Sequence, residues 1–165
     1  MSYLLRHEAW GHCFGRLGDE YGGSQPSDDA FRQDLANYHN AAKPQQLNIA
    51  SSSNRDEAPW RMFFNYPAEY PEVGMFEGAY HRNTGSWRPT DDSIMRSHAT
   101  EFNAPCRWFI IERIMRLSGE TMSFEEFVTW DARNRNKVKQ AKHSMIPVIP
   151  GTTLGPVSGD DIILN

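Results

Sequence analysis

Cysteine is scarce in this chain, basic residues do not cluster, and no long apolar run occurs. The 165 residues include two cysteines, Cys13 and Cys106, too few for a disulfide framework or a thiolate zinc site. The two alternatives are a single disulfide between them and burial of both as small apolar side chains, and burial is the commoner outcome. The net charge of -4 without a basic cluster argues against nucleic acid as a partner. No stretch has the length of a membrane span.

The residues that are present indicate a folded domain. Hydrophobic residues make up 39% of the chain, with five Trp, six Tyr and nine Phe, a composition typical of globular rather than disordered proteins. A length of 165 residues is enough for one domain with a sizeable core and hardly enough for two. We therefore expect one domain.

The stretch LLRHEAWGHCFGRLGDEY, Leu4 to Tyr21, is the densest group of metal-ligating residue types. Zinc peptidases commonly carry two histidines four residues apart on one helix, with a glutamate after the first. Here His7 and His12 lie five apart, a spacing that in a regular helix turns the rings about 140° from each other. A π-bulge absorbs one extra residue. We predict a helix over residues 4–14 that is widened around Ala9 to Gly11, because glycine accepts unusual dihedrals.

A catalytic zinc takes three protein ligands and leaves one position open. His7 and His12 supply two, and the third must come from the loop that follows their helix. In that loop we favour Asp19, with Glu20 as the alternative. Glu8 follows His7 directly, where it would act as general base toward the water that the metal activates.

Several residues mark the ends of helices. Gly15 is expected as a left-handed residue that ends the first helix, and Gly119 ends a helix over 105–118 that Pro105 opens. Ser27 is expected to cap a helix in SDDAFRQDLANYHNAAKP, and the capping box SFEE introduces a helix over 124–135.

The aromatic and glycine-rich stretch 59–89 predicts short extended pieces and structured loops rather than long helices. Residues 146–165, rich in Pro, Gly and Val, predict an extended C-terminal tail after a domain of residues 1–145. The expected fold class is therefore mainly α with short irregular β pieces.

The segment HEAWGHCFGRLGDEY resembles the active-site stretch of the IgA-peptidase-type zinc metalloendopeptidases, a metzincin-like family. Members read H-E-x-G-H or H-E-x-x-G-H, followed by F-G-x-L-x-D-E-Y. Later segments are similar to family segments in the same order: PWRMFF, EVGMFEGAYHRNTGSWRPTDDSIMR, FNAPCRWFIIERI and FEEFVTWDA. The resemblance covers the chain from about Leu4 to Arg135.

The resemblance implies a zinc-dependent endopeptidase that acts on a peptide or protein substrate and is secreted or held at the cell surface. It implies His7, His12 and Asp19 as ligands of one catalytic zinc ion and Glu8 as the catalytic base. It also implies that Met95, in DSIMRS, forms the methionine turn that metzincins place beneath the metal.

Two departures from the family stand out. Trp10 occupies a position where small residues are common, and we expect it to crowd the bulge. Only six residues precede His7, so we expect this chain to be the C-terminal portion of a metzincin-like α+β zincin domain whose N-terminal sheet it lacks.

The alternative function is a catalytically inactive fragment that binds metal or peptide without turnover. It would expose an apolar face on Leu4, Leu5 and Trp10 and would self-associate through it. If the chain is catalytic, Tyr80, His81 or Tyr21 would be candidate donors to the oxyanion.

Overall fold

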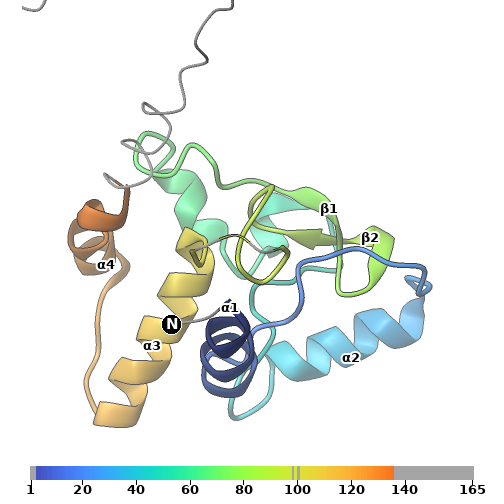
Figure 1. Cartoon of the computed structure of the whole chain (residues 1–165), viewed down its shortest axis with the longest axis horizontal. Helices are drawn as coiled ribbons and strands as arrows, with labels where there is room; N and C mark the ends of the chain where they lie inside the picture. The colour runs from blue at the N-terminus through green and yellow to red at the C-terminus, as the bar shows by residue number, and fades with distance from the viewer. Residues whose placement is uncertain (1–2, 98, 100, 136–165) are drawn as a thin grey trace, which may run out of the picture. The chain divides into compact units, whose positions relative to one another are not determined.

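The computed structural model describes residues 3–97, 99 and 101–135 (Figure 1). The chain divides into a unit of Met1–Asp131 and a unit of Ala132–Asn165. The first unit is mainly helical and holds one short two-stranded antiparallel sheet, which agrees with the predicted mixture. The predicted boundary at 145 and the tail 146–165 lie outside the described residues. Within those residues, no helix is both long and apolar enough to cross a membrane.

The first helix is widened along most of its length. A short α-helical piece, α1 (Tyr3–Leu5), leads into a π-helix, η1 (Arg6–Phe14). At its end the Gly15 amide donates to the Trp10 carbonyl five residues back, at 2.8 Å. The predicted π distortion is thus confirmed, and it extends well beyond residues 9–11.

The predicted left-handed glycine at the end of this helix is wrong. Gly15 is right-handed (φ -71°), and Arg16 takes the left-handed conformation (φ 55°). The reason for glycine at 15 is space, because a Cβ there would fall 2.9 Å from the carbonyl oxygens of Gly11 and Trp10. The turn closes when the Leu17 amide donates to the Gly11 carbonyl at 3.0 Å, so the chain reverses directly behind the two histidines.

Helix α2 (Asp29–His39) buries Phe31 and Leu35 on one stripe. Its cap is Asp28 and not the predicted Ser27, because the Asp28 carboxylate accepts from the Phe31 amide at 2.9 Å. The Ser27 hydroxyl instead donates to the Gly85 carbonyl at 2.8 Å. The buried stripe packs with Ile49, Ala79 and Tyr80, so α2 lies against the tip of the hairpin.

The hairpin consists of β1 (Phe76–Ala79) and β2 (Arg82–Arg88), with a register shift between Glu77 and Ala79. Trp87 of β2 also forms a bridge with Ala50 on its other side. Two short 3₁₀ helices, η2 (Arg55–Glu57) and η3 (Arg61–Asn65), precede it. This part of the chain contains short extended pieces and structured loops, as predicted.

Helices α3 (Ala104–Ser118) and α4 (Phe124–Trp130) complete the unit. Asn103 caps α3, Gly119 ends it in the left-handed region (φ 77°), and Ser123 caps α4 through the predicted capping box. Helix α4 is shorter than predicted, because it ends at Trp130, although residues 132–135 are helical again.

Helix η1 lies beside α3, as the blue and yellow ribbons of Figure 1 show. A Cβ on Gly15 would fall 3.0 Å from Cγ1 of Ile110, and the Arg113 guanidinium lies 5.5 Å from the centre of the Phe14 ring. The main core joins the aromatic loops to α3 and α4, and its fully buried side chains include Trp60, Phe63, Tyr70, Ile94, Met95 and Phe127. The histidine-bearing helix therefore rests on a packed base.

Candidate metal centre

Three side-chain atoms converge where the π-helix meets the loop that follows it. The Nε2 atoms of His7 and His12 lie 3.1 Å apart. Oδ1 of Asp19 lies 3.2 Å from the first and 3.1 Å from the second. Among the described residues these three form a group that could hold a metal ion. The sequence left Asp19 and Glu20 open, and the structure brings Asp19 to the two histidines.

The widened helix is what makes this convergence possible. With the extra residue absorbed, the two imidazole rings meet edge to face with their centres 4.7 Å apart. On a regular helix the same spacing would direct the rings about 140° apart. The π geometry therefore converts an unusual spacing into a shared site.

The hydrogen bonds behind the rings determine which nitrogen is available. Nδ1 of His7 donates to the Ile94 carbonyl at 2.7 Å, and Nδ1 of His12 donates to the Leu17 carbonyl at 2.8 Å. A carbonyl oxygen only accepts, so each Nδ1 carries the hydrogen and each Nε2 presents a lone pair. This arrangement, with a backbone carbonyl behind a ligating imidazole, is the usual support of a metal-binding histidine.

The donor set fits zinc in both size and type. In a tetrahedral zinc site with bonds of about 2.0–2.1 Å, neighbouring ligand atoms lie about 3.3–3.4 Å apart. The three separations here are 3.1–3.2 Å. Two imidazoles and one carboxylate also match catalytic zinc sites, which keep a fourth position open.

The pKa values of His12 and Asp19 are both shifted, because the lone pairs of His7, His12 and Asp19 point toward one common space. The hydrogen bond to Asp19 raises the pKa of His12, against the opposing effect of burial. Burial also raises the pKa of Asp19, but the hydrogen bond that His12 donates when it is protonated, together with the one from Tyr21, leaves it below its ordinary value. A positive charge between the two Nε2 atoms and Oδ1 of Asp19 would therefore be stabilised. A proton or a metal ion would supply that charge.

Glu8 and Trp10 both lie on the exposed side of the helix. The Glu8 carboxylate is exposed, and its charge contributes to the raised pKa of His12 and of Tyr21, so it lies close to the site. Trp10 is 44% exposed and contacts Phe14 edge to face. Trp10 thus lies at the surface of the helix, and its crowding of the bulge stays a prediction.

Met95 lies directly under the helix. It is fully buried in a turn where the amides of Arg96 and Ser97 both donate to the Ser93 carbonyl at 3.0 Å. A Cβ on Gly11 would fall 2.4 Å from Sδ of Met95. Gly11 has no left-handed backbone, so close packing on Met95, and not dihedral freedom, is the reason for glycine there.

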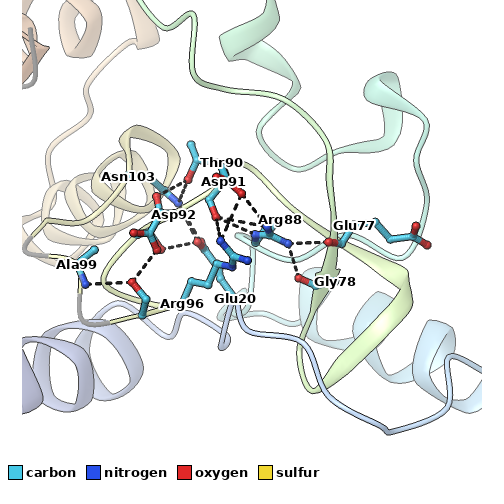
Figure 2. A network of polar contacts seen from close by, with 12 residues as sticks. Glu20, Glu77, Gly78, Arg88, Thr90, Asp91, Asp92, Arg96, Ala99 and Asn103 are labelled. Carbon is cyan, nitrogen blue, oxygen red and sulfur yellow. Dashed lines mark hydrogen bonds and ion pairs between the residues drawn. The ribbon is translucent and has the colours of Figure 1, made fainter. Parts of the chain in front are cut away.

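Glu20 faces away from the histidines into a network of polar groups. Its buried carboxylate accepts from Asn103 Nδ2 at 3.0 Å, from Asn48 Nδ2 at 3.0 Å and from the Ser93 hydroxyl at 2.5 Å. Figure 2 shows Glu20 below Asn103 and Thr90, with Arg88 bonded instead to the carbonyls of Glu77 and Gly78. Burial raises the pKa of Glu20.

The Glu20 network joins distant parts of the chain to the loop that carries Asp19. The Glu20 amide also donates to the Met95 carbonyl at 2.8 Å. Three connections therefore fix this residue, to the loop at Asn48, to the turn at Ser93 and Met95, and to the cap of α3 at Asn103. Glu20 is consequently a structural residue next to the site.

The three candidate oxyanion donors occupy different places. The Tyr21 hydroxyl donates to Oδ2 of Asp19 at 2.9 Å, and Nε2 of His81 lies 3.4 Å from the same oxygen. The Tyr80 ring instead stacks on Phe31 with centres 6.1 Å apart, so Tyr80 belongs to the packing of α2.

The two cysteines are both free, Cys13 exposed and Cys106 buried. The expected burial is thus correct for Cys106 and wrong for Cys13. The Cys106 thiol donates to the Glu20 carboxylate at 3.2 Å, and burial raises its pKa well above the ordinary value.

His7, His12 and Asp19 meet around a common point and form a group that could hold a metal ion. Residues 55–114 match the family model described as IgA Peptidase M64. The match confirms, over these residues, the resemblance drawn from the sequence. It spans the hairpin, the Met95 turn and most of α3, and it contains none of the three residues that could hold a metal. No curated protein matches the chain.

Proposed function

We propose that this chain carries the catalytic centre of a zinc-dependent endopeptidase of metzincin-like type. His7, His12 and Asp19 hold the ion, and Glu8 is the general base. The observation that carries the proposal is the convergence of two Nε2 atoms and one Oδ1 atom at 3.1–3.2 Å, with both Nδ1 atoms bonded to backbone carbonyls. The family match over residues 55–114 supports it independently, because it rests on other residues.

Zinc, when bound, supplies a Lewis acid that polarises the scissile carbonyl and lowers the pKa of water. The side chains perform the proton transfers. The Glu8 carboxylate accepts a proton from the water whose oxygen attacks the carbonyl carbon. As the C–N bond breaks, Glu8 returns that proton to the leaving amine nitrogen. Its exposed position beside His7 leaves it open to a substrate.

Met95 and Gly11 support the metzincin-like assignment. A buried methionine in a tight turn packs against the ligand-bearing helix at the one position that has no side chain. The same turn accepts the hydrogen from His7 through the Ile94 carbonyl. Met95 therefore acts by packing and not by ligation.

The test measures zinc and hydrolysis on the same preparations. Atomic emission on the freshly purified chain is expected to give about one zinc per chain, falling to background in His12→Ala. Hydrolysis of a peptide library is expected to fall by roughly 10²–10⁴-fold in Glu8→Gln, while its zinc content stays at the wild-type value. Background zinc in the wild type, or full activity in Glu8→Gln, would refute the proposal.

A second candidate function is the binding of metal or peptide without turnover. Leu4, Leu5 and Trp10 are 64%, 50% and 44% exposed, an apolar surface next to the site that favours association. Light scattering that shows an oligomer, together with bound zinc and no hydrolysis, would favour this candidate. A Leu5→Ser variant that becomes monomeric would then identify the surface.

A further inference from the structure

The two oxygens of Asp19 have different partners. Oδ1 faces the Nε2 atoms of His7 and His12 at 3.2 and 3.1 Å. Oδ2 accepts a hydrogen bond from the Tyr21 hydroxyl at 2.9 Å and lies 3.4 Å from Nε2 of His81. His81 is not part of the three-residue group that could hold a metal. Its place is therefore behind the carboxylate and not among the ligands.

The backbone that carries His81 adopts a costly conformation. Tyr80 and His81 form the tip between β1 and β2, and both have positive φ, 50° and 62°. Two-residue hairpin turns of this kind normally use Asn and Gly. A positive φ on other residues is strained and persists only where the surroundings impose it.

Backbone hydrogen bonds impose this conformation and tie the tip to the Asp19 segment. The Tyr80 amide donates to the Asp19 carbonyl at 2.9 Å, and the His81 amide donates to the Tyr21 carbonyl at 3.1 Å. The Gln25 amide donates to the His81 carbonyl at 3.0 Å. The Tyr21 and His81 rings also meet edge to face with centres 4.8 Å apart. The hairpin tip thus holds His81 in one place relative to Asp19.

We propose that Tyr21 and His81 are positioning residues that clamp Oδ2 of Asp19, so that this carboxylate presents only Oδ1 to the metal. A carboxylate with a free second oxygen can bind a metal through both, and would then fill the position that catalysis needs open. This clamp, formed by Tyr21 and His81, rests on one part of the proposed function, the binding of a metal by His7, His12 and Asp19. It requires no peptide hydrolysis.

The test compares metal binding in the full chain and in four variants. Tyr21→Phe removes one hydroxyl, His81→Leu removes the imidazole, and His81→Gln keeps an N–H donor. Tyr66→Phe is the matched control, because the Tyr66 hydroxyl donates to another carboxylate, that of Glu125, at 3.2 Å. Zinc affinity is measured by competition with a coloured chelator, and coordination by the visible spectrum of the Co²⁺-loaded chain.

Tyr21→Phe and His81→Leu are each expected to weaken zinc binding by about tenfold or more, the usual effect of losing a group that orients a ligand. Their Co²⁺ absorption falls in intensity as the coordination number rises, and His81→Gln restores most of both properties. If both loss variants bind zinc like Tyr66→Phe and keep the wild-type Co²⁺ spectrum, the clamp is refuted. A wild-type chain that binds zinc and cleaves nothing refutes only the peptidase, whereas one that binds no metal refutes both.

Discussion

Substituting Gly11 by alanine tests whether packing on Met95 holds the π-helix in place. A Cβ at position 11 would fall 2.4 Å from Sδ and 3.0 Å from Cε of Met95, and 3.6 Å from Phe102. Met95 has no exposed surface, so its side chain cannot move into solvent. The helix must rise or the methionine must adopt a strained rotamer.

The expected cost follows from two opposing effects. Overpacking of a core by one methyl group typically costs about 1–3 kcal/mol. Alanine regains up to about 1 kcal/mol through its higher helix propensity. We therefore expect Gly11→Ala to lower the free energy of unfolding by about 1–2 kcal/mol, which for a chain of this size corresponds to a Tm lower by about 3–6 °C.

The assay is urea unfolding with chelator present, on Gly11→Ala, Met95→Ala and the double variant. Met95→Ala alone should cost about 2–5 kcal/mol because it leaves a cavity. In the double variant the new methyl group enters that cavity, and the cost of Gly11→Ala should vanish, a coupling of about 1–2 kcal/mol. An equal cost of Gly11→Ala in both backgrounds would refute the contact as the cause.

Three other predictions concern His39, the two cysteines and Glu20. Burial lowers the pKa of His39, so below about pH 6.5 the unfolded chain binds a proton that the folded chain does not. The free energy of unfolding should therefore fall as the pH falls below that value, and urea titrations of His39→Gln should show a shallower decline. Ellman's reagent should titrate one thiol, Cys13, in the native chain and two in denaturant, since Cys106 is buried; two rapid native thiols would contradict this. Glu20→Ala leaves the donors of Asn48, Ser93 and Asn103 without their acceptor and should cost about 3–5 kcal/mol of unfolding free energy.

Local rules were sufficient for much of the first helix and for α3. The angle per residue of a helix showed that His7 and His12 need a widened turn, and the structure has one. Asn103 and Gly119 end α3 by capping rules that involve only neighbours in sequence. Asp19 is favoured over Glu20 from its place in the loop after the helix, and the family pattern supports that choice. The structure shows the physical difference, since one carboxylate meets the histidines and the other is buried.

Features that depend on residues far apart in the chain could not be predicted from the sequence. The Glu20 carboxylate accepts hydrogen bonds from Asn48, Ser93 and Asn103, which lie 28, 73 and 83 positions further along the chain. No local sequence pattern predicts such partners. The sequence offers His81 as a candidate oxyanion donor. Its place behind Asp19 depends on how the hairpin tip docks on residues 19–21. For Gly11 the sequence predicts dihedral freedom, whereas the contact that requires glycine is with Met95, 84 positions further along the chain.

The bond between His7 and the Ile94 carbonyl spans 87 residues, and this separation has a consequence for biosynthesis. At about 5–20 residues per second, the ribosome adds Ile94 roughly 4–17 s after His7. A helix as short as η1 is marginal alone in water, so the histidines emerge without the turn that orients them. The proposed metal centre can therefore form only after the hairpin and the Met95 turn have been synthesised and have docked, so that binding of an ion there would follow synthesis of most of the described chain.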